Sequence, residues 1–327
     1  MARLELHLFG SYQVEIDGKP ASSFRSDKVR ALLAYLAMES GHAHRRESLA
    51  ARFWPDSDDS AARASLRMAL SNLRQVLQPV LGEDNAPPPL EITRHTAQLH
   101  SEHPDCWLDV ARFKAWLDAC SAHPHHDLTH CLVCIPRLAQ AVALYTGDFL
   151  AGLTLADATS FDEWRLLHQE KYHQRALAAL QTLAQHHLAG GDTTQAQQYA
   201  RQQLSLAPWS EKAHRQLMQA LALAGQLGAA LAQYEVCCRV LAEEMGVEPT
   251  AETVALAGQI EAGEMAQLEA SGRHSFVPAK LPHNLPPQTT PFIGRRKEVT
   301  EVRRLLLDPA YRLVKLVGTG GVGKKWQ

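Results

Sequence analysis

A stretch of helical length near the N-terminus keeps its apolar and its basic side chains on opposite sides. It runs from Ser60 to Val80 and reads SAARASLRMALSNLRQVLQPV. At 100° per residue, four leucines fall on one narrow stripe: Leu66, Leu70, Leu73 and Leu77. The other side carries Arg63, Arg67, Ser71, Arg74 and Gln78, and the stretch holds no Asp or Glu. Such a helix suits a DNA major groove, where arginine contacts guanine edges or phosphates. An ordinary amphipathic surface helix with solvated charges fits the same pattern.

Two strands and two helices are predicted before this stretch. Leucines at positions 4, 6 and 8 alternate with polar residues, and apolar residues at 12, 14 and 16 do so again before the turn Asp17-Gly18. This alternation predicts two short, half-buried strands. Ser26 then has the position of an N-cap for a helix that ends near Gly41, and a second short helix covers about residues 45–53. The acidic residues at 56–59 would cap the basic helix.

After the basic helix, a β-hairpin completes the pattern. The prolines at 87–89 interrupt the chain. Residues 90–93 and 97–100 are then predicted as two strands around a tight turn that carries Arg94 and His95. Three helices followed by a hairpin make a winged helix, with the hairpin as its wing.

Four segments of this region resemble the OmpR/PhoB-type winged-helix domain, in the version that opens the SARP family of bacterial transcription regulators. They read LHLFGSYQVEIDGKP, KVRALLAYLA, FWPD and SLRMALSNLRQVL. The resemblance covers about residues 1–102 and implies that the third helix enters the major groove while the wing touches the flanking backbone. It makes Arg63, Arg67, Ser71 and Arg74 base or phosphate contacts, and Arg94 a wing contact. The region is neutral, with 12 Lys/Arg and 12 Asp/Glu up to His100. Attraction to DNA must therefore be local, and its salt dependence modest.

The middle of the chain is predicted to be all-helical and to contain a repeat. Gly191-Asp192 and Gly225-Gln226 are 34 residues apart, and Ala196 and Ala230 follow at the same offset. This period and these small residues resemble tetratricopeptide (TPR) helix pairs. The predicted fold is mainly α, with an α+β winged helix over residues 1–102 and an all-α, TPR-like domain over residues 103–265.

Four further segments resemble the bacterial transcriptional activator domain, which follows the winged helix directly in the SARP family. They read LYTGDFLAGL, FDEW, LAPWSEKAHRQLMQALALAGQLGAALAQYE and EEMGVEPTAET. The resemblance implies protein contact, dimerisation or activation, and no catalysis.

A cysteine- and histidine-rich segment, CSAHPHHDLTHCLVC, begins at Cys120. Zinc prefers four tetrahedral sulfur or nitrogen ligands. Cys120, His123, Cys131 and Cys134 would supply them, and His125, His126 and His130 are alternatives to His123. A structural zinc is one interpretation, and small buried cysteines beside solvated histidines are the other. A catalytic zinc is not expected, because nothing nearby supplies a general base in an apolar cleft.

The last segments are predicted to be a proline-rich linker over residues 266–291 and the start of a P-loop domain over residues 292–327, which resembles that of larger SARP proteins. Gly318, Gly323 and Lys324 meet the phosphate-binding pattern, but Lys325 replaces the hydroxyl residue that ligates magnesium. We therefore expect a vestigial site without ATP binding. A premature stop, a frameshift or a partial gene would explain this end.

Together these patterns predict a DNA-binding transcription regulator, an activator that is not an enzyme. Its partners would be promoter DNA, a second copy of the chain on that DNA and RNA polymerase. No apolar run of membrane-spanning length occurs and no signal peptide opens the chain, so we expect a cytoplasmic protein. Two alternatives remain: a TPR-like scaffold whose winged helix docks a protein, and a nucleotide-gated switch.

Overall fold

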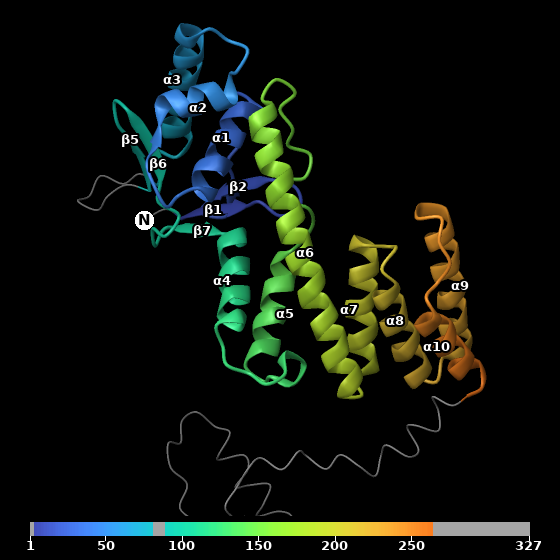
Figure 1. Cartoon of the computed structure of the whole chain (residues 1–327). Coiled ribbons are helices and arrows are strands. Elements are labelled where there is room, and N and C mark those ends of the chain that lie inside the picture. Colours follow the sequence, from blue (N-terminus) through green and yellow to red (C-terminus); the bar gives the residue numbers. More distant parts are fainter. Residues whose placement is uncertain (1–2, 81–88, 264–327) are drawn as a thin grey trace, which may run out of the picture. The chain divides into compact units, whose positions relative to one another are not determined.

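Three helices at the N-terminus confirm the predicted order of elements around the basic stretch. The computed structural model describes residues 3–80 and 89–263 (Figure 1). The three helices are α1 (Asp27–Met38), α2 (Arg46–Phe53) and α3 (Asp59–Val76). Helix α3 ends four residues before the predicted Val80. Gln78 therefore lies in the turn that follows, and its predicted place on the helix is wrong.

A four-stranded sheet, in the order β3-β2-β1-β7, lies beside these helices. Its strands are β1 (Leu4–His7), β2 (Gln13–Ile16), β3 (Lys19–Pro20) and β7 (Cys106–Leu108). The predicted turn at Asp17-Gly18 joins β2 to β3, and both residues have positive φ angles, of 53° and 70°. This left-handed pair is typical of a tight hairpin turn. Strand β7 was not predicted. It pairs in parallel with β1, so the sheet extends beyond residue 102.

The wing is a three-stranded sheet in the order β4-β6-β5. Strands β5 (Leu90–Ile92) and β6 (Thr96–Leu99) form the predicted hairpin. The third strand, β4 (His44–Arg45), immediately precedes α2 and pairs with β6. This pairing joins the start of α2 to the wing.

The rest of the described chain is helical. It comprises α4 (Asp109–Ser121), the short 3₁₀ helix η1 (Leu128–His130), α5 (Cys134–Leu144), α6 (Thr159–Ala189), α7 (Thr193–Leu206), α8 (Glu211–Leu223), α9 (Leu227–Glu244) and α10 (Ala251–Glu261). Gly191 and Gly225 have φ angles of +74° and +76° at the equivalent turns before α7 and α9. Ala196 and Ala230 are fully buried where neighbouring helices pack. These positions confirm the 34-residue repeat.

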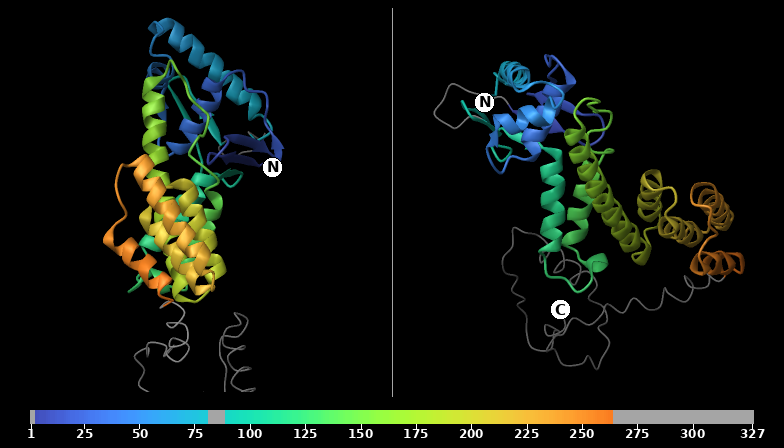
Figure 2. Two further views of the ribbon diagram at one scale, coloured as in Figure 1. Left: turned by 90° about the vertical axis from the view of Figure 1, so that its right-hand side faces the viewer. Right: turned by 45° about the horizontal axis from the view of Figure 1, so that its top comes forward.

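Helix α6, which is 31 residues long, connects the winged helix to the helical domain (Figures 1 and 2). Near its start, the Arg52 guanidinium donates to the Ser160 carbonyl over 2.8 Å. One turn later, the Trp164 indole N–H donates to the Glu39 carboxylate over 2.9 Å. A single hydrophobic core runs from β1 through α1 and α3 to the middle of α6. The winged helix and the first helices of the helical domain therefore share one core.

A buried carboxylate makes a second connection between the two parts. Asp109, at the start of α4, accepts from the backbone N–H groups of Leu8 and Phe9 over 2.8 and 2.9 Å. The N–H of Val110 donates to its other oxygen over 2.6 Å. Burial raises the pKa of Asp109, and the three amides oppose that shift. The carboxylate holds the end of β1 against the first helix of the helical domain.

Among the described helices, none is both long and apolar enough to cross a bilayer. The predicted linker and the P-loop residues Gly318, Gly323 and Lys324 lie outside the described residues.

Candidate nucleic-acid interface

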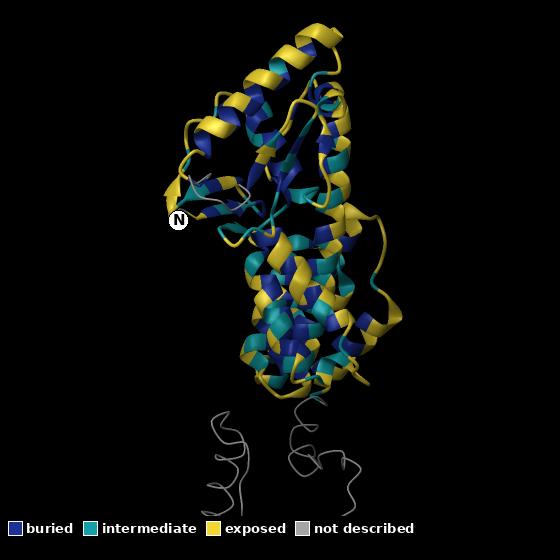
Figure 3. Ribbon diagram, turned by 90° about the vertical axis from the view of Figure 1, so that its left-hand side faces the viewer, coloured by how far each residue is buried: buried dark blue, intermediate teal, exposed yellow. Residues whose placement is uncertain are grey.

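The two sides of α3 differ as the sequence predicts. The four leucines of its stripe are at most 2% exposed. The polar side chains predicted to contact DNA are all exposed, on the helix or just after its end: Arg63, Arg67, Ser71, Arg74 and Gln78. In Figure 3 most of this helix carries the colour of exposed residues, interrupted by its buried positions. The side chains that the prediction directs outward are therefore accessible.

An acidic residue caps the start of α3. The Asp58 carboxylate accepts from the backbone N–H groups of Ser60 and Ala61, both over 2.9 Å. Two amides that lack a partner within the helix are thus satisfied. The cap fixes where α3 begins, and hence which residues face outward.

A cavity of about 630 Å³ lies between α3, the start of α2 and the turn of the wing. It is lined by Arg45, Arg46, Glu47, Arg63, Leu66, Arg67, Arg94, His95 and Thr96. Five guanidinium groups therefore surround one hollow that holds a single carboxylate. The fold brings together three of the predicted contacts, Arg63, Arg67 and Arg94, whereas Ser71, Arg74 and Gln78 do not line the cavity.

Arg45 and Arg46 were missed at the sequence level, and Arg46 positions the wing. Its backbone N–H donates to the His95 carbonyl over 2.9 Å, and its guanidinium donates to the Thr93 carbonyl over 3.3 Å. The Thr93 hydroxyl accepts from the Thr96 N–H over 2.9 Å and closes the turn. These bonds hold Arg94 at the tip of the turn, facing the same hollow as α3.

The arginines of α3 differ in their own partners. The Arg63 guanidinium donates to the Asp59 carbonyl over 2.9 Å and lies 3.4 Å from the Asp59 carboxylate. Both side chains are more than half exposed, so water screens the pair. Within the described residues, Arg67 has neither an ion pair nor a side-chain hydrogen bond. The same holds for Arg74, but of these two arginines only Arg67 lines the cavity, so its guanidinium is available to a ligand there.

A buried amide fixes α3 against the segment that precedes α1. Asn72 is 3% exposed. Its side-chain oxygen accepts from the Arg25 N–H over 2.9 Å, and its side-chain nitrogen donates to the Ser23 carbonyl over 3.1 Å. Both bonds link segments nearly 50 residues apart, so the amide sets how α3 lies on the domain.

We expect Asn72→Ala to lower the free energy of unfolding by about 1–3 kcal/mol, because two backbone groups lose their partner. Guanidinium denaturation followed by circular dichroism measures this loss as a lower midpoint. Asn72→Asp, which keeps an acceptor for Arg25 but removes the donor to Ser23, is the matched variant. A midpoint unchanged in Asn72→Ala would show that the amide does not hold the helix.

The cysteine- and histidine-rich segment lies away from this cavity, between α4 and α5. His123, His125, Cys131 and Cys134 place their ligand atoms within 4.8 Å of one another. Cys120 is not part of this group, so the structure does not bring all four predicted ligands together. Its thiol is buried in the core and points to the Cys134 carbonyl, 3.7 Å away. His125, which the sequence offers as an alternative to His123, belongs to the group together with it.

Comparison with known proteins finds similarity to bacterial regulatory proteins over nearly the whole chain. The family model of the bacterial transcriptional activator domain matches residues 108–261. The regulatory protein AfsR of Streptomyces griseus is 28% identical over 94% of this chain, and AfsR of Streptomyces coelicolor is 27% identical over 98% of it. The chain spans about 30% of the length of these relatives.

A third relative is also a regulatory protein, and its structure has been solved. The transcriptional regulatory protein EmbR of Mycobacterium tuberculosis is 32% identical over 35% of this chain and 28% of its own length. The structure of EmbR in complex with a low-affinity phosphopeptide superposes with a TM-score of 0.56 and 25% identity. The match covers 83% of this chain and 70% of that one.

Proposed function

Because the chain belongs to the SARP family of bacterial transcriptional regulators, we propose that its winged helix binds promoter DNA and that its role is regulatory rather than catalytic. The observation that carries this proposal is the cavity of five arginines between α3 and the wing. A helix with its side chains is about 10–12 Å wide, which matches the major groove. With α3 in the groove, the wing turn would lie over the neighbouring phosphates.

The arginines divide into two roles in this arrangement. Arg67, on the exposed face of α3, would contact a base edge, since a guanidinium can donate two hydrogen bonds to guanine. Arg94 at the tip of the wing would contact a phosphate, which fixes orientation but carries no sequence information. Arg63, Ser71 and Arg74 would add contacts along the groove.

Charge supports binding at the arginine-lined cavity. Residues 1–100 include as many acidic as basic residues, but five arginines and one glutamate line the cavity. The attraction is therefore local. Each phosphate that an arginine neutralises releases counterions. The slope of log affinity against log salt is therefore proportional to the number of phosphates contacted.

The helical domain would act through protein contacts. Several apolar side chains on it are about half exposed or more: Leu166, Leu167, Trp209, Met245 and Val247. Such side chains support contact with a second copy of the chain on DNA or with RNA polymerase. Two copies on tandem sites would gain affinity through effective concentration.

Selection of bound fragments from random DNA tests the proposal, followed by titration of the selected site at several salt concentrations. We expect one enriched sequence motif and an affinity that decreases with salt. If the folded chain enriches no sequence and binds no duplex at low salt, the winged helix is not a DNA-binding module.

Replacing the wing arginine should change this salt dependence. We expect Arg94→Ala to weaken binding by a similar factor on all sequences and to reduce the slope of log affinity against log salt by about 1. Arg112→Ala removes the same charge from an exposed position on α4 and is the control. A variant Arg94→Ala with the slope of the unmodified chain would remove the wing from the interface.

A further inference from the structure

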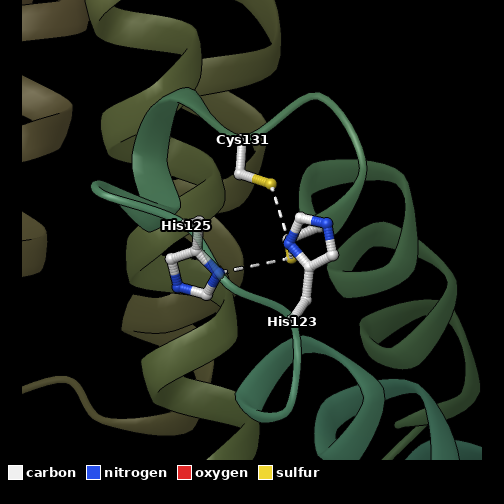
Figure 4. Close-up of side chains that lie close together, drawn as sticks. His123, His125 and Cys131 are labelled. Carbon is white, nitrogen blue, oxygen red and sulfur yellow. Dashed lines mark hydrogen bonds between the residues drawn. The ribbon is translucent and has the colours of Figure 1, made fainter.

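Figure 4 shows His123, His125 and Cys131, from the connection between α4 and α5, with their side chains turned toward one another. The Nδ1 atom of His123 lies 3.6 Å from the Cys131 sulfur and 3.5 Å from the Cys134 sulfur. The Nδ1 atom of His125 lies 3.8 Å from the Cys134 sulfur. All four ligand atoms lie within 4.8 Å of one another. The arrangement thus has the size of a metal coordination shell rather than that of scattered contacts.

These distances agree with a tetrahedron around zinc. Zinc binds thiolate sulfur at about 2.3 Å and imidazole nitrogen at about 2.0–2.1 Å, so neighbouring sulfur and nitrogen ligands should lie roughly 3.6 Å apart. The three distances between sulfur and nitrogen atoms are 3.5, 3.6 and 3.8 Å. We propose that His123, His125, Cys131 and Cys134 form a structural zinc site.

The charge and the ligand number favour a closed site. Two thiols lose their protons on binding, and two thiolates balance the charge of Zn²⁺. Cys134 is fully buried and Cys131 is partly buried, so a neutral centre avoids the cost of a buried ion. Four protein ligands leave no open position for water or a substrate. The site is therefore structural and not catalytic.

The other histidines of the segment are not ligands. His130 Nδ1 lies 2.8 Å from the Asp127 carboxylate, which also accepts from the Thr129 hydroxyl. His126 is exposed and lies outside the group of four. The segment thus divides its histidines between the metal centre and a separate hydrogen-bonded turn.

The fold explains what zinc would stabilise. His123 follows the C-cap residue of α4, Ala122, and Cys134 is the first residue of α5. The metal would close the long connection between these helices across its whole length. The same connection rests on α6, where the His186 ring and the Thr129 carbonyl are 2.6 Å apart. Zinc would therefore hold the connection in the position that contacts α6.

Metal analysis of the full chain, purified without chelator under reducing conditions, tests the proposal. We expect about one zinc per chain, and near zero in Cys131→Ser and Cys134→Ser. His125→Ala should weaken zinc binding by more than the roughly 10–100-fold caused by removing a hydrogen-bonding partner of a ligand. Cys120→Ser and Cys106→Ser are the matched controls and should retain the metal.

Cobalt in place of zinc reports the ligand set even if a variant is unstable. The absorption spectrum should be that of a tetrahedral centre with two thiolates, and Cys120→Ser should leave it unchanged. A chelator should lower the melting temperature of the unmodified chain but not that of Cys131→Ser. The proposal is overturned if zinc added under reducing conditions does not bind at one equivalent. It is also overturned if Cys120→Ser loses the metal while His125→Ala keeps it, or if Cys131 and Cys134 form a disulfide that metal does not prevent.

Discussion

Phe161→Ala is expected to lower the free energy of unfolding by roughly 3–5 kcal/mol, since a large, fully buried ring would leave a cavity. Phe161 lies in the first turn of α6, with its ring centre 5.4 Å from that of Phe53 and 5.5 Å from that of Trp164. Phe53 belongs to α2, whose first residues line the arginine cavity. The substitution should therefore weaken the packing between the winged helix and α6. Guanidinium denaturation measures the loss in free energy of unfolding.

Leu167→Ala is the matched control, because this side chain lies on the same helix and is 72% exposed. Its effect should stay within about 0.5 kcal/mol. If Phe161→Ala does not fold, Phe161→Leu keeps part of the volume and should show a smaller loss of the same sign. A loss below about 1 kcal/mol in a folded Phe161→Ala variant would mean that the contact between α2 and α6 is not tightly packed.

Arg67→Ala is expected to weaken binding to the selected DNA by about 1–3 kcal/mol, or roughly 5- to 150-fold. The reason is that a contact to a base edge would be lost while the buried leucines of α3 remain in place. The preference at one base position should relax as well. Titration of the selected site and of a variant site, each with the same protein preparation, measures both effects.

Two variants separate a base contact from a charge effect. Arg67→Lys keeps the charge but loses the planar guanidinium, which can donate two hydrogen bonds to one base. This variant should still bind DNA, but the difference in affinity between the selected site and the variant site should be smaller. Arg239→Ala removes an exposed arginine from α9 in the helical domain and should leave binding unchanged. Full operator affinity in a folded Arg67→Ala variant would contradict the assignment of α3 as the recognition helix.

The features that sequence could predict are those with a local period. Three such patterns can be read from the sequence, and the structure confirms them. They are the leucine stripe of α3, the alternation in β1 and β2, and the 34-residue repeat. The hairpin of the wing is also local, because its turn connects neighbouring strands. Order and type of these elements followed from pattern alone.

The features that sequence did not predict depend on residues far apart in the chain. Strand β7 has three residues, too few for a period, and forms only because β1, about 100 residues earlier, offers a free edge. Arg45 and Arg46 reach the cavity because β4 pairs with the wing. Cys120 lies outside the group of His123, His125, Cys131 and Cys134, since its thiol at the end of α4 is buried in the core. The DNA contacts of Arg63, Arg67, Ser71, Arg74, Gln78 and Arg94 stay predictions.

An unbroken α6 also constrains how this chain can evolve or be engineered. Each residue inserted into a continuous helix rotates everything beyond it by about 100° and advances it by about 1.5 Å. Phe161 and Trp164 face the winged helix from one end, while Leu183 and Leu188 pack in the helical domain at the other. A single inserted residue between them would misalign these two contact faces, whereas length changes in the loops would not. Chimaeras between relatives should therefore be joined outside this helix.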